Sequence, residues 1–198
     1  MYKAVCLFLL LGVFTSFAQV NLDSGLVAWY PFNGNANDES GNGNNGTING
    51  AILTTDRFGS ENAAYYFDGI SNTIFIGDND ILNPHTGNMT IALWIKQAEN
   101  RHQRAFSKGT WGGAQPGYTI MQYPINPEAK PACILGVDGH EHIIIANEVE
   151  AINVWHFMCG VINRAGYLVL WVDGIKQSDS SYIGDHFNID ISSGTGDA

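Results

Sequence analysis

The chain has 198 residues, with 9 Lys+Arg against 19 Asp+Glu and a formal net charge of -10. This charge repels nucleic acid and anionic lipid, so we exclude nucleic-acid binding. The length suits one domain around a single core better than two domains.

The N-terminus has the pattern of an export signal. Lys3 precedes an unbroken apolar run from Ala4 to Phe14, and the small residue Ala18 follows shortly after it. The run is well short of the roughly 20 apolar residues that a membrane span requires. We therefore predict a signal peptide at residues 1–18 and a secreted or cell-surface domain, without a membrane span, at residues 19–198.

Apolar residues then recur mostly at every second position, in short runs broken by Gly, Asn, Asp and Pro. This is the pattern of half-buried strands joined by turns, and it predicts an all-β, two-sheet antiparallel sandwich. A single helical turn is expected at Asn79–Leu82. The expected strands are Leu26–Phe32, Ala64–Phe67, Thr73–Ile76, Met89–Lys96, Ala105–Lys108, Tyr118–Gln122, Ala132–Val137, Ile143–Asn147, Trp155–Asn163 and Leu168–Val172.

Two of these strands alternate clearly enough for their faces to be assigned. In both, one set of alternate positions is fully apolar and is predicted to face the core. The opposite face of the later strand is also unusually apolar for a surface in solvent. The inward residues are Ile91, Leu93, Ile95, Leu168, Leu170 and Val172, and the outward ones include Tyr167, Val169 and Trp171.

The order of motifs along the chain resembles that of bacterial laminin-G-like domains of the concanavalin A-like lectin/glucanase group. The most specific part is the opening, Gly25–Gly34 followed by Asn37–Thr47. The later motifs are Tyr66–Gly69, Met89–Lys96, Phe106–Gly109, Trp155–Phe157 and Leu170–Gly174. The resemblance implies a jelly roll. It also implies a closing C-terminal strand that is not seen before the chain ends at Ser192–Ala198. The chain is then either a fragment of a longer protein or a sandwich that lacks edge strands, and we expect the fragment because an unpaired strand invites aggregation.

Several motif residues have a direct physical reading. Trp29, Trp94 and Trp155 are expected to fill core volume. The pairs Asp68-Gly69 and Asp173-Gly174 follow strand ends and favour hairpin turns.

The resemblance also implies calcium, because laminin-G-like domains commonly hold it in the loop that corresponds to Asn37–Thr47. Calcium takes six to eight oxygen ligands, which a Gly-rich loop with an acid can supply. We expect Asp38 to be a ligand, with oxygens from Gly43 and Asn45. The alternative is a turn-forming loop with no ion.

Two histidines and two cysteines belong to residue types that often bind metal or react, but simpler structural roles also explain them. His140 and His142 could share one face of a strand and hold zinc, but no third ligand is evident and a hairpin tip is expected. Cys133 and Cys159 could form a disulfide in an oxidising compartment or remain two buried thiols.

A hydrolase is not expected. Glucanases of this fold carry a Glu-x-Asp-x-x-Glu string that aims carboxylates into one cleft, and the sequence has none. Glu148 and Glu150 would share a face of an extended segment, but a solvated edge explains them better. The sequence also lacks a Gly-x-Ser-x-Gly nucleophile motif.

We therefore expect an extracellular binding module for a polysaccharide, a glycoprotein or another cell-surface ligand, with a protein-binding adhesive domain as the alternative. Sugar binding needs exposed aromatic rings beside polar groups. The candidates are Trp111 in a Gly-rich loop, Tyr118 and Tyr123 beyond it, and Trp171. Trp111 could equally fold back as a lid over the sandwich.

Overall fold

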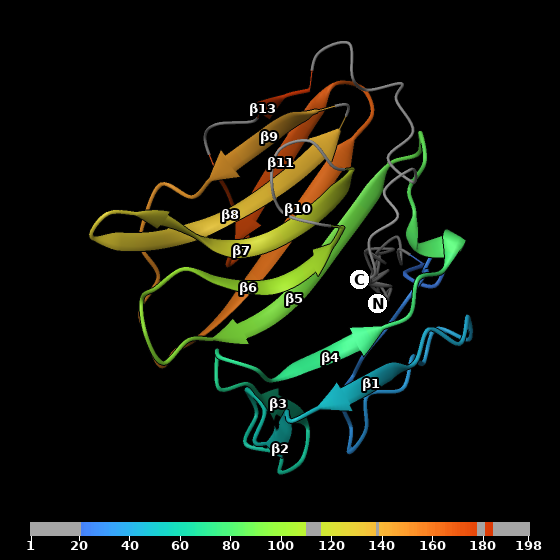
Figure 1. Ribbon diagram of the computed structural model, residues 1–198, viewed down its shortest axis with the longest axis vertical. Coiled ribbons are helices and arrows are strands. Elements are labelled where there is room, and N and C mark those ends of the chain that lie inside the picture. Colours follow the sequence, from blue (N-terminus) through green and yellow to red (C-terminus); the bar gives the residue numbers. More distant parts are fainter. Residues whose placement is uncertain (1–20, 110–115, 138, 178–180, 184–198) are drawn as a thin grey trace, which may run out of the picture.

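The computed structural model describes residues 21–109, 116–137, 139–177 and 181–183, and the predicted signal peptide lies outside them. Two antiparallel sheets make up most of this structure and pack face to face (Figure 1). One sheet has the strand order β12-β11-β10-β5, with β13 also paired to β11, and the other has the order β6-β7-β8-β9. The first comprises β5 (Met89–Lys96), β10 (Trp155–Asn163), β11 (Tyr167–Val172), β12 (Ile175–Lys176) and β13 (Ser181–Tyr182); the second comprises β6 (Gln103–Lys108), β7 (Gly117–Ile125), β8 (Glu128–Val137) and β9 (His140–Ile145).

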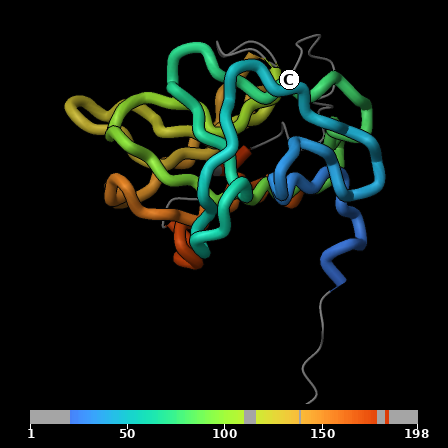
Figure 2. The backbone as a smooth tube through the Cα atoms, turned by 90° about the horizontal axis from the view of Figure 1, so that it is seen from below, coloured from blue at the N-terminus to red at the C-terminus, as the bar shows by residue number. Residues whose placement is uncertain are grey.

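Four short strands form two small ribbons at one end of the sandwich. β1 (Gly46–Asn49) pairs with β4 (Thr73–Ile76), and β2 (Ile52–Thr54) pairs with β3 (Ala64–Tyr66). A 3-10 turn at Asp80–Leu82 follows β4. The ribbons lie below the large sheets in Figure 1, so the cyan part of the tube crosses in front of the sandwich in Figure 2.

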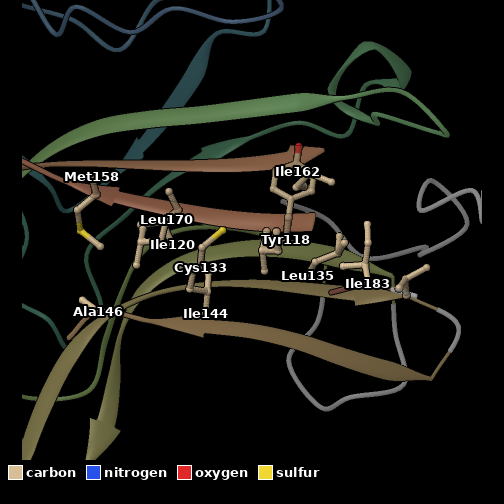
Figure 3. Close-up of a cluster of buried hydrophobic side chains, with 12 residues drawn as sticks. Tyr118, Ile120, Cys133, Leu135, Ile144, Ala146, Met158, Ile162, Leu170 and Ile183 are labelled. Atoms are coloured by element: carbon tan, nitrogen blue, oxygen red, sulfur yellow. The ribbon is translucent and has the colours of Figure 1, made fainter. Parts of the chain in front are cut away.

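The core lies between the two large sheets, where alternate side chains of β7, β8 and β9 meet those of β10 and β11 (Figure 3). Each fully buried aliphatic side chain contributes about 1.5–3 kcal/mol to folding. Gly160 on β10 is needed at this interface, because an added Cβ would lie 2.6 Å from Cys133 Sγ. The buried cluster consists of Tyr118, Ile120, Cys133, Leu135, Val137, Ile144, Ala146, Met158, Ile162, Leu168, Leu170 and Ile183.

The sandwich confirms the predicted fold class and most of the predicted strands. β4, β5 and β10 have the predicted bounds, and the turn at Asp80–Leu82 is present. The exposure of β5 alternates along its whole length, as its sequence predicted. No helix in the described ranges is both long and apolar enough to cross a membrane.

The predicted strand Leu26–Phe32 is wrong. Its backbone bonds to the following loop instead of to another strand: Trp29 N–H donates to the Asp38 carboxylate, and Val27 O accepts from Asn44 Nδ2. Phe32 also has φ +56°, which no strand residue adopts.

The two Asp-Gly pairs have different roles. Asp173 and Gly174 have φ +49° and +79° and form the two-residue turn between the paired strands β11 and β12, as predicted. The hairpin predicted at Asp68-Gly69 is wrong, because β3 and β4 pair with different strands. Asp68 Oδ1 instead accepts hydrogen bonds from the backbone N–H groups of residues 70, 71 and 72, which lowers its pKa to about 2.

The two cysteines of the sandwich are free thiols. Cys133 faces the core, whereas Cys159 is paired across strands with Ala92 and Trp171 on the opposite face of its sheet. Their side chains therefore project to different sides of the β10 layer, and the disulfide alternative is excluded in this fold.

Candidate functional site

The outer face of the β5-β10-β11 sheet carries most of the exposed aromatic side chains of the two large sheets. Strand alternation places these side chains opposite the core. Trp94, Tyr167 and Trp171 keep 43%, 44% and 37% of their surface exposed. We call this surface the aromatic face; it consists of Trp94, Trp155, Phe157, Tyr167, Trp171 and Tyr182.

The strand register explains why these rings lie together. Trp94 is directly opposite Phe157, and their ring centroids are 5.3 Å apart. Trp171 is opposite Cys159, one diagonal step from Phe157. Three adjacent strands thus contribute one ring each to a row about 10 Å long, since neighbouring strands lie about 4.8 Å apart.

The prediction that Trp29, Trp94 and Trp155 fill the core is wrong for all three. Trp94 belongs to the aromatic face, and Trp29 is 51% exposed beside the Asp38 loop. Trp155 is partly buried on the aromatic face, where Lys96 Nζ lies 5.3 Å from its ring centroid.

The four predicted ligand-binding aromatics do not form one platform. Trp111 lies outside the described residues. Tyr118 is 3% exposed in the core, with its hydroxyl donating to Leu82 O at 2.6 Å, so its predicted exposure is wrong. Tyr123 lies on the outer face of the other large sheet, on the opposite side of the sandwich from Trp171. Trp171 alone joins the aromatic face.

Backbone N–H groups that donate to the Asp38 carboxylate hold the Asp38 loop in place. Oδ1 accepts from the backbone N–H groups of Trp29 and Ser40, and Oδ2 accepts from that of Asn44, at 2.9–3.0 Å. Burial would raise the pKa of Asp38, but these bonds outweigh it and lower the pKa.

This loop does not fit the calcium site that we expected. A calcium site turns oxygens inward, whereas here N–H donors surround the acid. Asn45 Oδ1 accepts from Asp38 N–H at 2.9 Å, and Gly43 has φ +76° at a turn. The three predicted ligands therefore form the turn-forming loop given above as the alternative.

A second polar cluster lies at the end of the sandwich where β5 ends and β10 begins. Glu150, in the β9–β10 connection, has only 4% of its side chain exposed. Its Oε2 accepts from Gln97 Nε2 at 3.2 Å and from Gln122 Nε2 at 3.1 Å. Glu150 Oε1 and Gln97 Oε1 are buried and have no hydrogen-bond partner among the described residues.

His156 links this cluster to the β11–β12 turn. Its Nδ1 lies 2.7 Å from Asp173 Oδ2, and its Nε2 lies 3.1 Å from Ala151 O. Burial opposes a charge on the ring, but these bonds and the charges of Glu150 and Asp173 outweigh it and raise the pKa of His156. Burial also raises the pKa of Glu150.

This cluster overturns the expected solvated edge at Glu150. The carboxylate is enclosed and hydrogen-bonded to two glutamines, so it does not present a group to a substrate. Its hydrogen bonds instead link the β9–β10 connection to Gln97, next to β5, and to Gln122 on β7. The predicted hairpin at His140 is confirmed by the β8–β9 pairing, and no group of three or more metal-binding side chains occurs in the described ranges.

The sequence contained part of the signal for the aromatic face. Alternation placed Trp94 and Trp171 outward, but the size of the tryptophan side chain favoured the core for Trp94. The register between β5 and β10, which brings Trp94 beside Phe157, depends on residues more than sixty positions apart and has no local signal.

The fold defines a jelly-roll β-sandwich of the concanavalin A-like class. The sequence profile of the concanavalin A-like lectin/glucanases superfamily, in its laminin-G-like form, matches residues 67–195, which is more than half of the chain. The chain belongs to this superfamily.

Solved structures share the fold at low identity. The receptor-binding domain of botulinum neurotoxin C/D mosaic serotype aligns with a TM-score of 0.62 and 16% identity, over 83% of this chain and 40% of that one. The binding domain of Paraclostridial Mosquitocidal Protein 1 gives 0.56 and 18%, over 78% and 39%. This chain thus spans about two fifths of both structures.

Domain 4 of AbnA, an extracellular arabinanase of Geobacillus stearothermophilus, was solved in complex with arabinotriose and matches over more of its length. Its TM-score is 0.55 at 14% identity, over 81% of this chain and 79% of that one. No curated protein matches the chain significantly.

Proposed function

We propose that this chain is an extracellular module that binds carbohydrate through the aromatic face. The observation that carries the proposal is the row of Trp94, Phe157 and Trp171 on three adjacent strands, with both tryptophans substantially exposed. Sugar rings have apolar faces that stack on aromatic side chains. Stacking also removes the apolar surface of the aromatic rings from water, which is favourable in free energy. A row about 10 Å long can hold more than one sugar ring of a chain.

The solved structures with this fold are consistent with a binding role. The arabinanase domain was solved in complex with arabinotriose, and a binding domain of botulinum neurotoxin DC was solved in complex with rat synaptotagmin II. The first supports carbohydrate as the ligand class, and the second represents the alternative of a protein partner. Export by the signal peptide at residues 1–18 would place the module outside the cell, where such ligands occur.

Binding without hydrolysis fits the carboxylates of the sandwich. Glycoside hydrolysis requires two accessible carboxyl groups that flank the scissile bond. Glu150 is enclosed by Gln97 and Gln122, and Asp38 is occupied by three N–H donors. Neither is available to a sugar, so we propose no catalytic role for them.

A glycan array probed with the wild-type chain and the double variant W94A/W171A tests the proposal. Y123A is the matched control, because Tyr123 is an aromatic residue on the opposite outer face. We expect the wild type and Y123A to bind the same glycans and the double variant to lose about tenfold in affinity or more, since each ring contributes stacking energy. A blank array for the wild type, or equal binding by the double variant, would overturn it.

A further inference from the structure

Three cationic side chains lie at the aromatic face of an otherwise acidic protein. The chain has only 9 Lys+Arg. Lys96 follows Trp94 on the same face of β5, Lys176 on β12 is directly opposite Trp171, and Arg57 projects over Trp94 from the loop between β2 and β3. All three residues are exposed.

Two of the three, Arg57 and Lys96, contact aromatic rings. Arg57 Cζ lies 4.1 Å from the ring centroid of Phe58 and 4.6 Å from that of Trp94. Lys96 Nζ lies 5.3 Å from the ring centroid of Trp155. Such cation–π contacts hold the charges against the surface and leave their outer side open to a ligand.

These three cations lack the carboxylate partner that two other cations of the described ranges have. Lys108 pairs with Asp78, and Arg101 Nε lies 3.2 Å from Glu99 Oε2. No such ion pair occurs for Arg57, Lys96 or Lys176 in the described part of the chain.

The acids at the margin of the face are already engaged. Asp173, opposite Phe157, bonds to His156 and to Phe157 N–H. Asp56, next to Arg57, accepts from the N–H groups of Phe58 and Ser60 at 2.8 Å. Neither carboxylate forms an ion pair with the three cations, although hydrogen bonds and, after them, the charge of Arg57 lower the pKa of Asp56.

We infer that the aromatic face binds an anionic polysaccharide, with sugar rings stacked on Trp94, Phe157 and Trp171 and with carboxylate or sulfate groups bound by Arg57, Lys96 and Lys176. This inference rests on the proposed carbohydrate function and specifies its ligand class. The cations stand at both ends of the row, Arg57 and Lys96 beside β5 and Lys176 on β12. Four strands from β5 to β12 span about 15 Å, so a polymer with repeated charges matches the spacing better than a single anion does.

The net charge of the chain opposes an anionic ligand. Only the local charge at the aromatic face favours it. With a net charge of -10, the protein repels polyanions at long range. Binding therefore depends on short-range contacts that the ligand makes with the three cations and with the aromatic rings. These contacts are exposed, so they weaken as salt rises and the screening length falls below about 10 Å.

The test compares three polymers of matched length by isothermal titration: polygalacturonate, sulfated dextran and neutral dextran. The variants are K96Q/K176Q, R57Q and, as a matched control on the other large sheet, K130Q. Thermal melts of each variant establish that it is folded. The polyuronate and the sulfated polymer separate carboxylate from sulfate as the source of the charge.

We expect at least one of the two anionic polymers to bind and neutral dextran to bind more weakly. R57Q should weaken binding roughly threefold to fivefold and K96Q/K176Q about tenfold, as expected for exposed charge pairs, and K130Q should match the wild type. Binding should also weaken between 50 and 300 mM salt.

Two results would overturn the inference in distinguishable ways. If a neutral glycan binds, W94A/W171A abolishes that binding and the charge variants leave it unchanged, the carbohydrate function stands and the anionic specificity falls. If no glycan binds and the chain self-associates through the aromatic face, as shown by dissociation of the W94A/W171A variant in sedimentation velocity, both proposals fall.

Discussion

His156 Nδ1 lies 2.7 Å from Asp173 Oδ2, while its Nε2 lies 3.1 Å from the carbonyl oxygen of Ala151. A carbonyl oxygen can only accept, and the pKa of Asp173 is lowered, so its carboxylate also accepts. Both ring nitrogens must therefore donate, and His156 is held as an imidazolium that joins the β9–β10 connection to the turn after β11.

The substitution D173N tests this protonation state. Asn tolerates the positive φ of position 173 and suits an Asn-Gly hairpin turn, so the turn is retained while the charge is removed. We expect the pKa of His156, measured by NMR titration, to fall toward the ordinary value of about 6.5. The wild-type pKa should lie above it, and a wild-type value at or below it would contradict the assignment.

The same cluster predicts how stability depends on pH. Because the folded pKa of His156 is raised, its contribution is complete below the unfolded value of about 6.5 and is lost as pH rises through the folded value. The raised pKa of Glu150 acts in the same direction, since its ionisation in the folded state is penalised by burial. Urea unfolding should therefore give lower stability at pH 8 than at pH 5.5.

The variants E150Q and H156Q test whether Glu150 and His156 cause this dependence of stability on pH. E150Q removes the buried charge of Glu150, and H156Q removes the titrating imidazole. Each variant should flatten the decline between pH 5.5 and 8, whereas Glu148 is exposed and E148Q should leave it unchanged. Equal slopes in all four proteins would exclude the cluster as the cause.

The Asp38 loop gives a prediction about calcium. D38A removes the acceptor of three backbone N–H groups and should cost about 2–3 kcal/mol in the free energy of unfolding. Addition of Ca²⁺ or EDTA should leave the wild-type melting temperature unchanged. A rise of several degrees with Ca²⁺ that D38N abolishes would show that Asp38 is a calcium ligand after all.

Tyr118 provides a contrast between core and surface. Y118F leaves Leu82 O without its donor and should cost about 1 kcal/mol, because a net hydrogen bond is lost in the core. Its glycan affinity should equal that of the wild type, measured by the same titrations. A loss of affinity without a loss of stability would return Tyr118 to the ligand site.

The sequence predicted the strands in which apolar and polar residues alternate regularly. Met89–Lys96 and Trp155–Asn163 alternate over eight or more residues, and the structure has them with the same bounds. Leu26–Phe32 alternates less clearly. Within this segment the backbone N–H of Trp29 donates to the Asp38 carboxylate, and the sequence pattern gives no indication of that hydrogen bond. At Trp94 the alternation and the residue type disagreed, and the alternation was right because a strand fixes the side of every residue.

The polar cluster could not be predicted in this way. Gln97, Gln122, Glu150, His156 and Asp173 come from five separate segments, and each alone is typical of an exposed loop or a strand end. Only the packing of the two sheets brings them together. The cationic side chains at the aromatic face were missed for the same reason.

Cys159 allows the most direct test of the aromatic face as the binding surface. It lies on that face between Ala92 and Trp171, partly buried, whereas Cys133 is fully buried and burial raises its pKa to about 12. Burial also raises the pKa of Cys159, so labelling with a maleimide is best followed at pH 8, with peptide mass spectrometry to identify the modified cysteine. Saturating polygalacturonate, or a neutral β-glucan if the array selects one, should slow the labelling of Cys159 about tenfold or more by covering the face. An unchanged labelling rate with the polysaccharide bound would show that the ligand lies elsewhere and would contradict the proposed site.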